Sequence, residues 1–173
     1  DSDDGTTIAT SSVSVYMRKT ITIADTGKIT QGVFNMDYDD GFVAYLNGKE
    51  IARANLGTSG VRPAYNLLAT ASHEATLYQG QKPDSFYLSK TFLATVLVNG
   101  TNVLTVETHN NTTTSTDLSS NPFLSFGFTD NGTYFSSLPS WFPVPPTEYM
   151  HAKFRFDKTG ETVLLSNAAG TIL

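Results

Sequence analysis

A two-residue periodicity along most of the sequence is the feature that most constrains the fold. In "SVSVYMRKTITI" (12–23), apolar residues occupy alternate positions from Val13 to Ile23, interrupted only by Lys19, as in a strand with one buried face. Further apolar β-forming runs are "GVFNM" (32–36), "FVAYL" (42–46), "FLATVLV" (92–98), "NVLTVETH" (102–109) and "PFLSFGF" (122–128). Short strands separated by turn residues, without a convincing amphipathic helix, predict an all-β fold, an antiparallel β-sandwich.

One hairpin is predicted by its turn residues. Asn47-Gly48 separates "FVAYL" from "KEIARA" (49–54), and these two residue types suit the positive φ angles of a type I′ turn. By contrast, the segment 57–90 is rich in turn residues and is predicted to be a long irregular connection.

Composition excludes several classes of function. The chain has 173 residues, a net charge of −5 and no cysteine. An acidic chain without a basic stripe is not expected to bind nucleic acid or an anionic membrane, and no apolar run is long enough for membrane insertion. Few charged residues, at 16%, and loops rich in Thr, Ser, Asn and Gly are typical of extracellular bacterial domains, so we expect a secreted or cell-surface protein. Because the sequence begins with Asp1, we expect a processed protein or an excised piece of a larger one.

Four motifs occur in an order that resembles a known family. They are "YMRKTITI", "DYDDGFVAYLNGKEIARANL", "GTNVLTVETHN" and "TSTDLSSNPFLSFGF", spread over residues 16–128. Together they resemble the galactose-binding-like jelly-roll modules of large secreted bacterial proteins. The resemblance implies a jelly roll, but such modules accompany enzymes and adhesins alike, so it does not assign one function.

Three segments are expected along the chain. Residues 1–130 would form the jelly-roll module, and the proline-rich residues 131–147 a crossing or linker. The tail, "HAKFRFDKTGETVLLSNAAGTIL", is similar to the middle of a lamin-tail-type domain. Residues 148–173 therefore either complete the sandwich or begin a second module, because so short a segment cannot form its own core.

The pair Asp39-Asp40, directly before Gly41, is the sharpest candidate site. Some jelly-roll lectins with a similar Asp-Asp-Gly use the adjacent acids to hold Ca²⁺, which prefers carboxylate and carbonyl oxygens. The alternative is that the acids bind backbone N–H groups and shape the turn. Adjacent strand residues point to opposite faces, so both acids reach one ion only if the backbone kinks. We expect Asp39 and Asp40 to be structural, with one of them bound to backbone N–H groups or to Arg53, and treat calcium as a candidate cofactor.

Other side chains are candidates for binding a glycan. Arg53 and Asn55 could hydrogen-bond sugar hydroxyls, although Arg53 could instead pair with Asp39 or Asp40. Loop tyrosines such as Tyr65 and Tyr78 are suited to stacking against sugar rings. His109 and Asp117 complete the set of candidate ligand-binding residues.

No catalytic constellation is apparent in the sequence. His109 and Asp117 have no accompanying nucleophile motif, and the three histidines are not spaced as zinc ligands. We therefore predict that the chain is not an enzyme but a carbohydrate-binding or adhesion-type accessory module of a multidomain protein. Its partners would be a polysaccharide or glycan and the neighbouring domains. The alternative is a structural spacer beside a catalytic neighbour, without a ligand of its own.

Overall fold

The computed structural model describes residues 8–9, 11–130 and 140–142. Contacts divide the chain into two compact units, residues 1–141 and 142–173, and everything below concerns the first. The predictions for residues 148–173 fall outside the described residues, as does most of the predicted crossing at 131–147.

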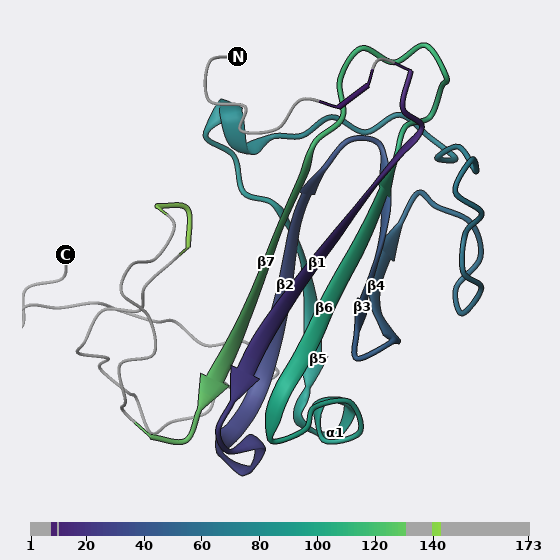
Figure 1. The fold of residues 1–173 in the computed structure, drawn as a ribbon. Coiled ribbons are helices and arrows are strands. Elements are labelled where there is room, and N and C mark those ends of the chain that lie inside the picture. Colours follow the sequence, from purple (N-terminus) through teal and green to yellow (C-terminus); the bar gives the residue numbers. More distant parts are fainter. Residues whose placement is uncertain (1–7, 10, 131–139, 143–173) are drawn as a thin grey trace, which may run out of the picture. The chain divides into compact units, whose positions relative to one another are not determined.

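Two antiparallel sheets form the described unit (Figure 1). The four-stranded sheet has the order β1 (Ser14–Ile23), β6 (Gly100–His109), β3 (Gly41–Leu46) and β4 (Lys49–Ala54). The three-stranded sheet has the order β5 (Asp84–Ser89), β2 (Ile29–Tyr38) and β7 (Ser120–Phe128). The prediction of an all-β antiparallel sandwich is therefore confirmed.

The predicted hairpin is present between β3 and β4. Asn47 and Gly48 have φ angles of 50° and 80°, as a type I′ turn requires. The Asn47 side chain also accepts a hydrogen bond from the backbone N–H of Val103 on β6, at 2.8 Å, and so ties the turn to the neighbouring strand. A bulge lies between Ala44 and Tyr45 in the register with β4.

Two elements differ from the sequence-based expectation. The run 92–98 was expected to be a strand, but Lys90–Leu93 form the short helix α1, because the Ser89 hydroxyl caps it by accepting the Phe92 N–H. Leu93, Val96 and Leu97 of this run are buried from the helix and the turn that follows it, whereas Val98 is 52% exposed. The end of the connection predicted as irregular, Asp84–Ser89, forms β5 by pairing with β2.

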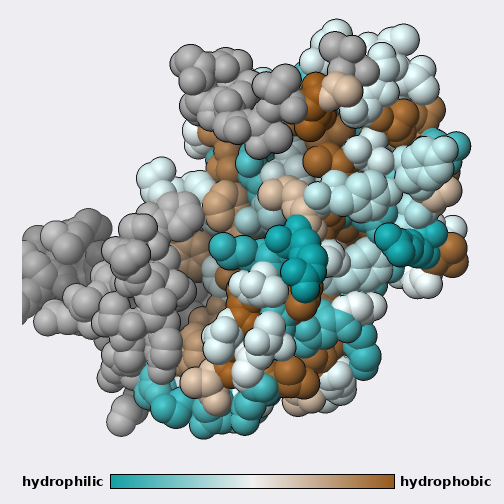
Figure 2. All heavy atoms as spheres, in the orientation of Figure 1, coloured by the Kyte–Doolittle hydropathy of each residue, from teal (hydrophilic) through white to brown (hydrophobic). Residues whose placement is uncertain are grey.

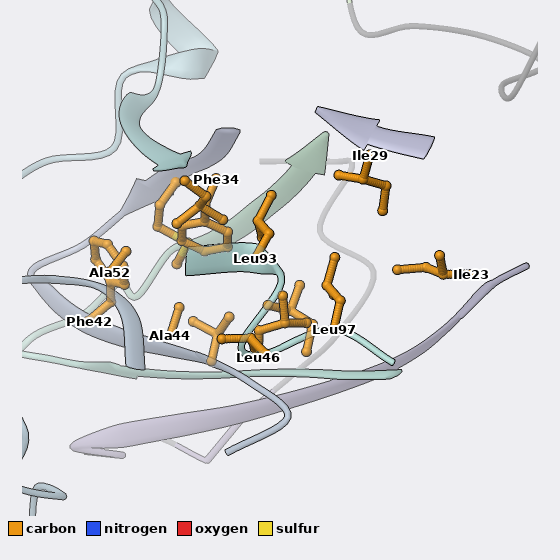
Figure 3. Close-up of a cluster of buried hydrophobic side chains, with 14 of the residues drawn as sticks. Ile23, Ile29, Phe34, Phe42, Ala44, Leu46, Ala52, Leu93 and Leu97 are labelled. Atoms are coloured by element: carbon orange, nitrogen blue, oxygen red, sulfur yellow. The ribbon is translucent and has the colours of Figure 1, made fainter. Parts of the chain in front are cut away.

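The core lies between the two sheets. Figure 3 shows Phe34 and Phe42 from opposite sheets facing the same interior, with Leu93 and Leu97 in the same cluster and Ile23 and Ile29 at its far end. Phe34 and Phe42 are fully buried, with ring centroids 6.0 Å apart. Burying such aromatic side chains stabilises a core by several kcal/mol, of order 3–5 kcal/mol per ring truncated to Ala.

The surface carries no continuous apolar area on the face drawn in Figure 2, where hydrophobic and hydrophilic residues are interspersed over the described part. No helix within the described ranges is long and apolar enough to span a bilayer. Trp141 packs edge-on against Phe123 of β7, with ring centroids 4.7 Å apart.

Candidate functional site

Three acids lie where β2 turns into β3, at one end of the sandwich. Asp37 is the second-to-last residue of β2, and Asp39 and Asp40 form the connection to β3. All three residues are buried. The loop after β6 and the loop leading to the short helix η2 (Leu77–Gln79) gather at this end, at the top of Figure 1. The Asp39–Asp40 peptide bond is cis.

Asp40 holds two of these loops by its carboxylate. Its Oδ1 accepts the backbone N–H of His73 at 2.9 Å, and its Oδ2 accepts that of Asn111 at 2.8 Å. Hydrogen bonds from two backbone donors satisfy a buried carboxylate, whose transfer from water would otherwise be costly. The interpretation of Asp40 as a residue that binds backbone N–H groups agrees with these contacts.

Asp37, three residues before Asp40, also accepts two backbone N–H groups with its carboxylate. Its Oδ1 accepts the N–H of Thr76 at 2.7 Å, and its Oδ2 accepts that of Leu77 at 3.2 Å. Asp37 and Asp40 thus fix the segment 73–77 from both ends.

Asp39 has a different environment. Its backbone N–H donates to the Ser119 carbonyl at 3.1 Å, but its carboxyl group neighbours that of Asp40 and accepts no backbone N–H from the described residues. Instead, oxygens of Asp39, Glu74 and Asp117 all lie within 4.8 Å of one another. We call these three residues the acid cluster. Asp39 is only 5% exposed, whereas Glu74 and Asp117 lie at the surface.

Burial first, and then the nearby charges of Asp40, Asp117 and Glu74, together raise the pKa of Asp39 from 3.8 to about 7. Both causes disfavour the ionised form, because the carboxylate is removed from water and surrounded by like charge. The cluster is therefore a place where a positive charge would be strongly favoured.

The sequence pointed to only part of this cluster. Asp39 was a candidate metal ligand and Asp117 a candidate ligand-binding residue, but their proximity was not predicted. Glu74 was missed as a partner of these acids, because it lies in an irregular connection and belongs to no motif. Only the folding of three distant loops onto one end of the sandwich brings these residues together.

Arg53 forms its ion pair with a different acid from those proposed. It was expected to contact Asp39 or Asp40, but its Nε and Nη2 donate to both carboxylate oxygens of Glu50, at 3.0 and 2.9 Å. The reason is local: Glu50 and Arg53 are on the same strand, β4, and the bulge between them places these residues, three apart, on the same face of the sheet. Hydrogen bonds from Arg53 lower the pKa of Glu50 to about 2.

Arg53 also supports the loop that follows β4. Its Nη1 donates to the Leu56 carbonyl at 2.6 Å and its Nη2 to the Val61 carbonyl at 2.9 Å. Asn55 likewise has a structural contact, since its side-chain amide donates to the Asp40 carbonyl at 3.2 Å. Whether Arg53 or Asn55 also binds a ligand stays a prediction, but both side chains already have protein partners.

Two buried polar side chains lie beneath this loop, on the outer face of β6. His109 Nδ1 is 2.6 Å from the Leu67 carbonyl, which can only accept a hydrogen bond, so this nitrogen carries the proton. His109 Nε2 is 3.7 Å from Glu107 Oε2, and both atoms are buried without a hydrogen-bond partner in the described residues. These two atoms therefore face each other with no hydrogen-bond donor between them in the described residues.

Exposed side chains surround this buried pair. Tyr16, opposite Glu107 in the register of β1 and β6, is 49% exposed and has its ring centroid 6.3 Å from that of His109. Tyr65 is 74% exposed, and its carbonyl accepts the hydroxyl of Ser14 at 2.8 Å. Arg62 has a side chain 78% exposed, with Nε 3.9 Å from Glu107 Oε1. We call Tyr16, Arg62 and Tyr65 the tyrosine face.

The remaining candidate, Tyr78, does not belong to the tyrosine face. It lies on η2, next to the Leu77 N–H that Asp37 binds, and its ring is exposed at the surface. The six predicted ligand-binding residues are thus divided. Tyr65 is linked to His109 through Ser14, whose hydroxyl binds the Tyr65 carbonyl and which pairs with His109 between β1 and β6. Asp117 joins the acid cluster, and the others lie elsewhere.

Fold and sites together define a small antiparallel β-sandwich module with an acid cluster at one end and a tyrosine-bearing outer face. The sequence matches no known protein family and no curated protein. Among solved structures, it is similar to α-L-rhamnosidase of Streptomyces avermitilis in complex with L-rhamnose, with a TM-score of 0.45 and 16% identity over 68% of this chain. It is also similar to β-D-mannosidase of Dictyoglomus thermophilum, with a TM-score of 0.35 and 15% identity over 58% of this chain.

This chain covers only 9% of each of those two enzymes. Similarity at this level transfers neither activity nor substrate, so what the module binds has to be inferred from its own residues.

Proposed function

We propose that this chain is a non-catalytic, galactose-binding-like accessory module that binds carbohydrate on its tyrosine face, within a secreted or cell-surface protein of several domains. The observation that carries the proposal is the placement of two exposed tyrosines and one exposed arginine around a buried Glu–His pair. Loops supported by a rigid sandwich are the usual position for binding residues.

The chemistry of the tyrosine face suits a sugar. Tyr16 and Tyr65 present large aromatic rings that lose little conformational entropy when a sugar ring stacks on them. Arg62 supplies several N–H donors for hydroxyl groups, and its Nε lies 3.9 Å from the buried carboxylate of Glu107. Exposed rings combined with a few oriented polar groups are typical of specific small-ligand sites.

Binding to soluble polysaccharides tests the proposal, by affinity electrophoresis first and calorimetry on the glycan that retards the protein. We expect Tyr65→Ala and Arg62→Ala each to weaken binding by about tenfold, or about 1.4 kcal/mol. Tyr87→Ala is the matched control, because Tyr87 is 67% exposed but lies on β5 of the opposite sheet.

Two outcomes would contradict this proposal. If no polysaccharide of a broad panel binds, the spacer without a ligand becomes the better explanation. If Tyr87→Ala weakens binding while Tyr65→Ala does not, a carbohydrate binds on the three-stranded sheet instead.

A further inference from the structure

Two buried hydrogen-bonding atoms lie side by side beneath the tyrosine face. Glu107 Oε2 and His109 Nε2 are 3.7 Å apart, and neither has a hydrogen-bond partner in the described part of the chain. With the ring proton of His109 on Nδ1, which faces the Leu67 carbonyl, Nε2 carries the lone pair and accepts, as a carboxylate oxygen does. A buried acceptor without a donor is unfavourable, so the pair is suited to a molecule that brings two donors.

The protein fixes both acceptors from behind. Glu107 and His109 are two residues apart on β6, so their side chains leave the same face of the sheet. The Leu67 carbonyl holds the other nitrogen of the His109 ring at 2.6 Å, and Glu107 is 3% exposed. The direction of the two acceptors is therefore set before any ligand arrives, which lowers the entropic cost of binding.

Two exposed side chains border the pair. The Tyr16 ring stands edge-on to that of His109, with an interplanar angle of 71°, and Arg62 lies beside Glu107 Oε1. Both side chains are largely solvent-exposed. Exposed side chains change rotamer within nanoseconds, and such changes are common when a ligand binds. Rotation of Tyr16 and Arg62 therefore opens the acceptors to a ligand without movement of the sheet.

The geometry and charge of the pair suit two neighbouring hydroxyl groups. Two acceptors 3.7 Å apart can each take one hydrogen bond from donors on adjacent carbon atoms of a sugar ring. A hydroxyl also accepts, so the same two groups can receive N–H donors from Arg62 on their other side. A ligand cation is disfavoured, because it would lie beside the Arg62 guanidinium.

We propose that Glu107 and His109 select sugars with two free hydroxyls on adjacent carbon atoms, one donating to Glu107 Oε2 and the other to His109 Nε2. The inference rests on the proposed function, carbohydrate binding at the tyrosine face, and names the part of the sugar that the face recognises. Tyr16 and Tyr65 provide stacking area, whereas Glu107 and His109 determine specificity. A site built for hydroxyl donors rejects an analogue that lacks one, because a buried acceptor then stays unpaired.

Competition by deoxy sugars tests the proposal on the unmodified chain. The probes are the methyl glycoside of the sugar that builds the polysaccharide found to bind, and its analogues that each lack one hydroxyl. We expect two analogues, those lacking either of two neighbouring hydroxyls, to compete at least about tenfold more weakly than the parent glycoside. Analogues that lack another hydroxyl should compete within about threefold of the parent.

Two conservative variants assign the recognition to these side chains. Glu107→Gln and His109→Asn should each weaken binding of the polysaccharide by about tenfold, since each removes one of the two acceptors. The asparagine amide keeps an N–H donor for the Leu67 carbonyl, so His109→Asn removes the acceptor with little change to the loop. Asp25→Asn is the control for charge and should bind as the wild type does, because its amide oxygen can still accept the Gly27 N–H.

The ring nitrogens of His109, observed by NMR at neutral pH, give a readout that needs no variant. We expect a proton on Nδ1 and none on Nε2; protons on both would overturn the proposal, because Nε2 would then donate to Glu107 itself. The proposal is also overturned if no two neighbouring hydroxyls matter, or if Glu107→Gln and His109→Asn bind as the wild type does. In those cases weaker binding by Tyr65→Ala would leave the proposed function standing, whereas a failure of every polysaccharide to bind removes both.

Discussion

Replacement of Asp40 by alanine would remove the contacts that join the turn between β2 and β3 to two loops. The substitution leaves the buried N–H groups of His73 and Asn111 without their acceptor. Each hydrogen bond to a charged group contributes about 1.5–3 kcal/mol, so the two together amount to about 3–6 kcal/mol. Removal of the like charge beside Asp39 offsets part of this loss.

We therefore expect Asp40→Ala to lower the free energy of unfolding by about 2–4 kcal/mol. For a domain of this size, that corresponds to a fall in Tm of about 5–15 °C. The assay is urea unfolding followed by circular dichroism, in CaCl₂ and in EDTA, with Asp40→Asn as a second variant that keeps the size and one acceptor oxygen. Asp40→Asn should lose about half as much.

The comparison of the two buffers tests whether Asp40 has a structural role or binds calcium. A structural Asp40 loses the same stability with and without calcium, because its partners are backbone N–H groups. A loss below about 1 kcal/mol in both buffers would refute the hydrogen-bond reasoning. A loss seen only in CaCl₂ would make Asp40 a metal ligand.

Two further predictions concern the ion pair between Glu50 and Arg53 on β4 and the packing of Gly41 at the start of β3. The pKa of Glu50 is lowered from 4.5 to about 2 in the folded state, so its contribution is present above pH 4.5 and is lost as the pH falls from 4.5 to 2. The difference in unfolding free energy between the wild type and Glu50→Gln should therefore be about 2–3 kcal/mol at pH 7 and shrink below pH 4.5; a difference independent of pH would contradict the pairing with Arg53. Gly41→Ala should cost about 1–3 kcal/mol, because the new Cβ would lie 2.7 Å from the Asn55 carbonyl oxygen and 2.9 Å from Ala69 Cβ. An unchanged urea midpoint for Gly41→Ala would show that this contact can relax.

The parts of the fold that were predictable from sequence are determined by residues that lie close together in the sequence. Asn47-Gly48 specifies its turn because these two residues tolerate the positive φ angles it needs. The alternation of apolar and polar residues similarly indicates strands with one buried face, and a chain of such strands has few ways to bury them other than a sandwich. The exception is the run 92–98, where the Ser89 cap selected a helix and the apolar residues reached the core from a turn.

The candidate sites depend on distant contacts, and only the tertiary structure decided them. The sequence identified Asp39 and Asp40 as unusual, but adjacent acids have different roles here, since Asp40 meets backbone donors while Asp39 meets Glu74 and Asp117. Loop residues carry no periodicity that would reveal their partners, because their positions follow from how the loops pack on the sandwich. The sequence by itself therefore determined most of the strands, the hairpin and the class of fold, whereas the acid cluster and the tyrosine face exist only because packing brings side chains from separate segments of the chain within reach of one another.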